Sequence, residues 1–141
     1  MNTNQINLNA ADDAGKLILR VVLSGLLLFH GVSKLIGGVG FITGMLAQAG
    51  LPSALGYLVY IGEVVAPLFI LFGVYTRLAG LVVVVNMIVA ILLVHTSQLF
   101  TVNQTGGWAL ELQAMYLVAG AALALMGAGR YSLGGAAGRF N

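Results

Sequence analysis

The strongest constraint on this chain is a run of 40 residues, Leu55 to Val94, whose only charged side chains are Glu63 and Arg77. A helix of that length measures about 60 Å, twice the roughly 30 Å thickness of a bilayer's hydrocarbon core. The run must therefore fold back on itself. We place the turn at Gly73 to Arg77, where Thr76 can cap the next helix and Arg77 can reach lipid headgroups. The predicted spans are about 54–73 and about 77–97.

Composition extends this membrane assignment to the rest of the chain. Charged residues make up 7% of the sequence, hydrophobic residues make up 60%, and the mean hydropathy is +1.01. A soluble domain carries roughly 25% charged residues, so this chain cannot cover a globule with a wetted surface. Its 141 residues suffice for four spans of about 20 residues with short connections. We predict an all-α polytopic membrane protein: a single domain, residues 1–141, forming a four-transmembrane-helix bundle.

The remaining spans flank the long run. Residues 17–36 are apolar enough for span one, and Trp108 begins span four, about 108–127, as an interfacial aromatic anchor. The glycine-rich connection after span one is too broken for a full span. Its middle predicts a short interfacial helix between spans one and two, with Phe41, Met45 and Leu46 on one face. Residues 1–15 and 129–141 are predicted as flexible tails.

Lysine and arginine residues indicate the orientation, because they are retained near the cytoplasmic ends of spans. Lys34 is the basic residue on one side. The other side holds Lys16, Arg20, Arg77, Arg130 and Arg139. We therefore expect both termini in the cytoplasm.

This topology places the ionisable residues within the spans at similar depths. Because a lone charge in the bilayer costs about 2.5–3.5 kcal/mol, these side chains are expected to face one another. His30 and Lys34 share a helix face at i, i+4, and Tyr60 and Glu63 share one at i, i+3. Trp108, Glu111 and Met115 lie at i, i+3, i+7, and His95 ends span three. We infer one interior polar cavity in the outer half of the bundle, with Lys34 pairing a carboxylate.

Several roles remain open for these residues. Glu63 and Glu111 could form interhelical hydrogen bonds, or could act as a proton relay or ligand-binding acid. Lys34 alone could extend to the interface. His30 and His95 could ligate a haem or, with the glutamates, a metal, but their spacing is not diagnostic and we predict no metal site. Asn86 is interpreted as a helix-packing residue.

Composition also excludes some functions. The chain has no cysteine, so disulfides, iron–sulfur clusters and thiol-based quinone reduction are excluded. Its net charge of +2 is too thinly spread for nucleic-acid binding.

Several motifs follow one another along the chain: Phe29–Lys34, Glu63 with Pro67, Gly73–Ala79, His95 and Gly127–Leu133. In order and spacing they resemble the DoxX family of small four-helix bacterial membrane proteins. The resemblance extends from about Leu17 to Gly134.

The resemblance implies a bacterial inner-membrane protein with a quinone-linked redox role, because relatives include the small subunit of thiosulfate:quinone oxidoreductase. A quinone would enter the cavity, with Glu63 and His95 exchanging protons and Lys34 or His30 polarising a carbonyl. Glu111 is a further catalytic candidate. The residues expected to bind the ring are Tyr60, Trp108 and Met115.

The sequence leaves open whether the chain is itself an enzyme, because electrons would have to come from a substrate or from a soluble or membrane redox partner. The alternative hypothesis is a non-catalytic membrane scaffold or a small-solute or proton carrier, with the same polar cluster holding helices together or passing protons. A lesser alternative is a bis-histidine haem or metal-binding membrane protein.

Overall fold

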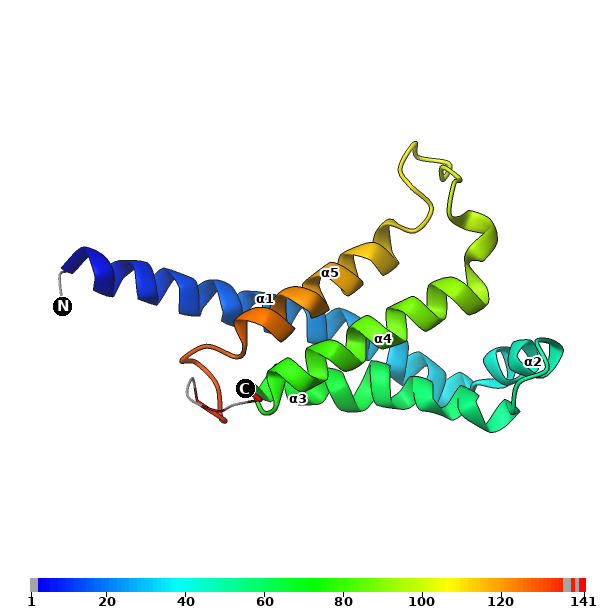
Figure 1. Cartoon of the computed structure of the whole chain (residues 1–141), viewed down its shortest axis with the longest axis horizontal. Coiled ribbons are helices and arrows are strands. Elements are labelled where there is room, and N and C mark those ends of the chain that lie inside the picture. Colours follow the sequence, from blue (N-terminus) through cyan, green and yellow to red (C-terminus); the bar gives the residue numbers. More distant parts are fainter. Residues whose placement is uncertain (1–2, 136–137, 139) are drawn as a thin grey trace.

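A computed structural model describes residues 3–135, 138 and 140–141, and the regular elements among them are helices (Figure 1). The predicted all-α class is therefore confirmed. The α-helices are α1 (Thr3–Gly37), α2 (Gly40–Gln48), α3 (Ala66–Phe72), α4 (Thr76–Val94) and α5 (Glu111–Met126). Two 3-10 helices, η1 (Ser53–Leu58) and η3 (Thr96–Gln98), and one π-helix, η2 (Ile61–Val65), complete the set.

Three helical segments of the described chain are long and apolar enough to cross a membrane: Leu8–Gly37, Ser53–Phe72 and Thr76–Val94. The second of these is the succession of η1, η2 and α3. The apolar helix α5 is shorter, at 16 residues. It begins at Glu111 because Trp108 belongs to the preceding loop, where it forms an isolated β-bridge with Val102.

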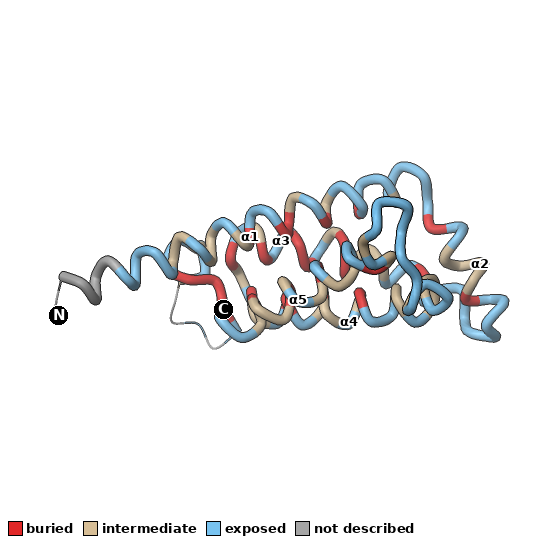
Figure 2. Tube along the Cα trace, turned by 90° about the horizontal axis from the view of Figure 1, so that it is seen from above, coloured by how far each residue is buried: buried red, intermediate tan, exposed pale blue. Residues whose placement is uncertain are grey.

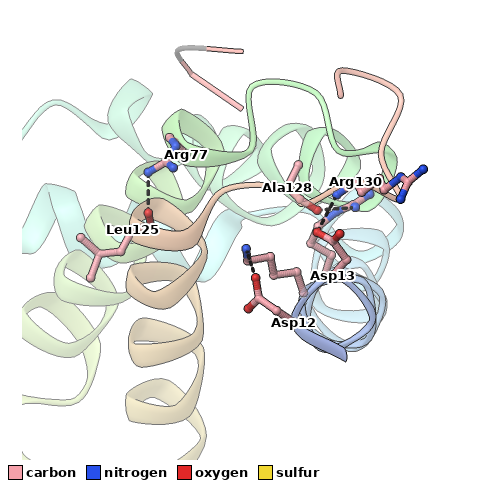
Figure 3. A network of polar contacts seen from close by, with 8 residues as sticks. Asp12, Asp13, Arg77, Leu125, Ala128 and Arg130 are labelled. Carbon is pink, nitrogen blue, oxygen red and sulfur yellow. Dashed lines mark hydrogen bonds and ion pairs between the residues drawn. The ribbon is translucent and has the colours of Figure 1, made fainter. Parts of the chain in front are cut away.

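Both segments predicted as tails contain more structure than expected. Helix α1 begins at Thr3, so most of the predicted N-terminal tail is helical. Lys16 pairs with Asp12 one turn earlier at 2.6 Å, and Asp13 accepts a hydrogen bond from the Arg130 backbone N–H at 2.9 Å (Figure 3). In the C-terminal segment, the Gly134 N–H donates to the Gly73 carbonyl at 3.0 Å.

The molecule has two ends. At the first, which we call the Arg20 end because the Arg20 side chain of α1 lies there, α3 and α5 finish and α4 begins. At the second, which we call the α2 end, α1 finishes and α2 packs beside η1. Helix α5 crosses α1 near the middle of the molecule and moves away from it toward the α2 end (Figure 1).

Buried residues recur along the helices where these pack on one another (Figure 2). The core cluster is Leu23, Leu27, Ala66, Ile70, Ala79, Val83, Met87, Tyr116 and Leu123. Many large apolar side chains on the outer faces are exposed, which suits a protein surrounded by lipid.

Arginines close the Arg20 end. Arg20 is 1% exposed, and its guanidinium donates to the carbonyls of Ile70 and Leu71 at 2.8 Å each. It also donates to the carbonyls of Ala128 and Tyr131, at 2.9 and 2.7 Å. One cation thereby satisfies the carbonyls that end α3 and those that follow α5.

The expected capping role of Thr76 was wrong. Thr76 makes no capping bond; its hydroxyl donates to the Asn141 side-chain oxygen at 3.1 Å, because the turn is buried beneath the C-terminal segment. Arg77 donates to the Leu125 carbonyl at 2.5 Å (Figure 3). Its contact with lipid headgroups stays a prediction.

Helices α4 and α5 approach closely at two glycines. A Cβ added at Gly80 would lie 2.6 Å from the Gly120 carbonyl oxygen, whereas one added at Gly25 in α1 meets nothing within 4 Å.

We therefore expect Gly80→Ala to lower the free energy of unfolding by about 1–3 kcal/mol, because backbone atoms cannot move aside as a side chain can. The matched change Gly25→Ala should be neutral or raise it by up to about 1 kcal/mol. Unfolding in detergent, followed by circular dichroism, measures both. Equal effects of the two substitutions would contradict this packing.

Candidate functional site

A pocket of about 910 Å³ opens between the helices toward the α2 end. Helix α2 contributes Phe41, Ile42 and Leu46 to its wall. The sequence predicted a polar cavity, but most lining side chains are apolar. The polar or ionisable lining residues are His30, Lys34, Glu63, Asn86, His95, Gln113 and Tyr116.

An ion pair projects into this pocket. Lys34 Nζ lies 2.5 Å from Glu63 Oε2, and the two side chains are 27% and 9% exposed. The expectation that Lys34 pairs a carboxylate is confirmed. The Tyr60 hydroxyl donates to the Lys34 carbonyl at 3.1 Å and links the same two helices.

The backbone around Glu63 is specialised. Glu63 lies in the π-helix η2, a helix form that is rare and frequent at functional sites. A Cβ at Gly31 of α1 would lie 2.3 Å from the Glu63 carbonyl oxygen, so glycine is what allows the close approach. Gly31 precedes Lys34 by three residues, so the close packing of α1 on η2 occurs beside the ion pair.

The two histidines occupy different parts of the pocket wall. The His30 ring contacts the Tyr116 ring edge-on, with centroids 6.0 Å apart. His95 Nδ1 lies 3.1 Å from Gln98 Oε1, and its Nε2 lies 3.2 Å from Gln113 Nε2. Within the described ranges, no group of three or more His, Asp or Glu side chains could hold a metal ion.

Two residues that line the pocket each carry one buried amide atom without a partner in the described part of the chain. Asn86 Nδ2 and Gln113 Oε1 have no hydrogen-bond partner among the described residues. Asn86 packs against Gly62 of η2, as expected of a helix-packing residue, although its amide nitrogen makes no hydrogen bond to another described residue. Sequence reasoning missed Gln113; its i, i+3 spacing from Tyr116 was the available signal.

Four predicted site residues do not line the pocket: Glu111, Tyr60, Trp108 and Met115. Glu111 is exposed, and Met115 is 68% exposed. The Trp108 indole N–H donates to the Leu99 carbonyl at 2.8 Å. Trp108 lies in the loop before the helix, whereas Glu111 and Met115 share a face of α5, but that face is the exposed one. The inward face of α5 instead carries Gln113, Tyr116, Gly120 and Leu123.

The fold and pocket define a class: a helical membrane protein with a largely apolar internal pocket that holds an ion pair. The chain belongs to the DoxX family, whose model matches residues 15–96. It is similar to a Bacillus subtilis (strain 168) protein named "Putative oxidoreductase CatD", with 30% identity over 110 residues. That alignment covers 78% of this chain and 81% of the relative. No solved structure gives a significant match.

The Lys34–Glu63 contact predicts energetic coupling. We expect Lys34→Met and Glu63→Gln each to cost roughly 2 kcal/mol or more of unfolding free energy, because each leaves a largely buried partner uncompensated. The double variant should cost less than the sum by at least about 1 kcal/mol. Denaturation in detergent measures the cycle.

Lys16→Met is the matched control, because Lys16 pairs with an Asp12 side chain that is 59% exposed. It should change stability by less than about 0.5 kcal/mol. Additive effects of the Lys34 and Glu63 substitutions would contradict the coupling.

Proposed function

We propose that this protein is the membrane subunit of a quinone-linked oxidoreductase system, and that the pocket receives the quinone head. The observation that carries the proposal is the combination of a large, mainly apolar pocket with a buried carboxylate–ammonium pair, Glu63 and Lys34, in its wall. Apolar pockets with a few placed polar groups are typical of sites for small lipophilic ligands. The similarity to a protein named as an oxidoreductase supports the redox assignment.

The side chains present suit proton exchange with such a ligand. Reduction of a quinone requires two protons, and oxidation of its reduced form releases them. Glu63 and Lys34 form one group in the pocket wall that can exchange protons. His95, which contacts Gln98 of η3, is a second such group. His30 and Tyr116 supply aromatic surface against which a ring can pack. Electrons would come from a redox partner or a bound substrate.

We further propose a four-span topology in the bacterial inner membrane, with α5 as the fourth span, α2 at the interface and both termini in the cytoplasm. The supporting observation is that Arg20 and Arg77 both donate to carbonyls at or after the end of α5, opposite α2, and that the Arg130 N–H donates to Asp13, three residues before Lys16. Figure 3 shows Arg77 and Arg130 at this end. Lys34 lies near the α2 end. Arg139, also assigned to the cytoplasm, lies outside the described residues.

The absence of cysteine allows a direct test of this orientation. Gln104→Cys, in the loop before α5, should react with a membrane-impermeant maleimide in intact bacterial cells. Tyr131→Cys, whose native side chain is exposed, should react only after permeabilisation. The reverse pattern, or labelling of both in intact cells, would overturn the proposed topology.

Ligand binding is tested by melting quinone-stripped protein in detergent with a short-chain benzoquinone. A ligand that binds the folded state adds about 2.7 kcal/mol at a hundredfold excess over Kd, so wild type should melt at a higher temperature. Glu63→Gln should lose most of this shift. Glu111→Gln makes the same chemical change at an exposed residue outside the pocket and should retain it.

No shift in wild type would overturn the quinone proposal. The scaffold or carrier alternative would then be favoured, because the Lys34–Glu63 pair also joins α1 to η2 in the absence of any ligand. An equal shift in wild type and Glu63→Gln would place the ligand away from the ion pair.

A further inference from the structure

We propose that the ligand enters the pocket sideways from the bilayer, through an apolar window between η1 and α4, and is therefore an uncharged molecule dissolved in lipid. This inference rests on the proposed function and extends it to the route of entry and the class of substrate. Its basis is a break in helix packing on one flank of the pocket, where the side chains at the rim are hydrocarbon.

The window lies where two walls of the pocket do not pack on each other. No Cα atom of η1 lies within 8 Å of a Cα atom of α4, and the structure describes both elements in full. Toward the Arg20 end the gap closes at Asn86, which lies against Gly62 of η2. Toward the α2 end it is bounded by α2, which packs on η1 and also comes close to α4. Figure 1 shows α4 moving away from the segment that follows α2, so the opening between these two closures faces sideways.

The rim of the window is apolar and exposed. Leu55 and Leu58 of η1 border it on one side, and Val89 and Leu93 of α4 border it on the other; all four line the pocket. Val89 and Leu93 follow Asn86 by three and seven residues, so they continue the face of α4 that meets η2. Leu55, Leu58 and Val89 are 44%, 55% and 50% exposed. A hydrocarbon can pass such a rim without losing polar contacts, whereas a charged molecule would lose its hydration there.

The other flanks of the pocket are tied together or carry ionisable side chains. The Tyr60 hydroxyl donates to the Lys34 carbonyl at 3.1 Å, and Lys34 pairs with Glu63, so α1 is held to the wall that precedes α3. Between α1 and α5, the His30 ring lies edge-on against Tyr116. His30 is exposed, so this flank presents an ionisable side chain where the η1–α4 flank presents hydrocarbon.

A ligand that enters through the window reaches the polar groups after the apolar rim. Lys34 comes from α1, no described Cα atom of which lies within 8 Å of α4, so its ion pair lies across the pocket from the α4 rim. A ring would enter with its polar end leading, and its hydrocarbon substituents would follow from the bilayer. The substrate class is therefore an uncharged ring with apolar substituents, such as a benzoquinone that carries an alkyl chain.

The experiment measures the association and dissociation rate constants of a short-chain benzoquinone by stopped-flow fluorescence, with full-length protein in lipid nanodiscs. A fluorophore on Gln48→Cys, in a chain that otherwise lacks cysteine, reports occupancy by quenching. Val89→Trp should slow both rate constants about tenfold and change Kd by less than about twofold, because entry and exit share the window. Val118→Trp makes the same change at an exposed valine of α5 outside the pocket wall and should alter neither rate.

Two further variants distinguish the possible routes. Leu58→Trp narrows the window from the η1 side and should reproduce the slowing even if Val89→Trp fails to fold. Leu112→Trp narrows the flank between α1 and α5 and should leave both rate constants unchanged.

Unchanged rates in folded Val89→Trp and Leu58→Trp would overturn the window, and so would slowing by Leu112→Trp. A weaker Kd with an unchanged dissociation rate would also overturn it, because the added ring would then occupy the site itself. In each of these outcomes wild type still binds, so the proposed quinone site would stand. Failure of the benzoquinone to bind wild type would overturn the proposed site and this inference together.

Discussion

Inside a bilayer every backbone carbonyl at a helix end needs a donor, and in this protein Arg20 supplies that donor to four carbonyls from two parts of the chain. Its side chain joins α1 to the end of α3 and to the segment that follows α5. Arg77 does the same for the last turn of α5. Away from this end, α5 diverges from α1 (Figure 1). The pocket lies toward the α2 end and is lined by residues of α1, α2, η1, η2, α4 and α5.

The pocket depends on glycines as much as on charges. Helices in lipid gain little from burying apolar surface against one another, so close packing and polar contacts must hold them together. Gly31 allows α1 to approach the Glu63 backbone, Gly62 makes room for Asn86, and Gly80 brings α4 against α5. The Lys34–Glu63 pair then joins two helices whose backbones are already close.

Predictions from the free-energy cost of placing charge in lipid were confirmed, whereas the prediction from helical residue spacing on α5 was wrong. The expense of lone charges in lipid correctly predicted that Lys34 meets a carboxylate, and hydropathy predicted spans that match the three long helices. The predicted inward face of α5 was wrong: Glu111 and Met115 share a face as their spacing requires, but Tyr116, Gly120 and Leu123 are the residues that the helix buries. The role of Arg20 could not be predicted, since its partners lie 50 to 111 residues away along the chain. Gln113 carries no charge and so gave no energetic signal.

The pocket wall has a consequence for how any ligand is selected. Among its lining residues, Leu81, Val85 and Val89 follow one face of α4 and are exposed on the surface that lipid covers in a membrane. A hydrocarbon tail that moves from the bilayer to this groove exchanges one apolar environment for another, and gains almost no free energy by leaving water. Tail length would then have little influence on occupancy. The few polar atoms of the pocket wall must therefore discriminate among the many lipids that diffuse past it. Membrane lipids compete with the ligand for the apolar part of the pocket.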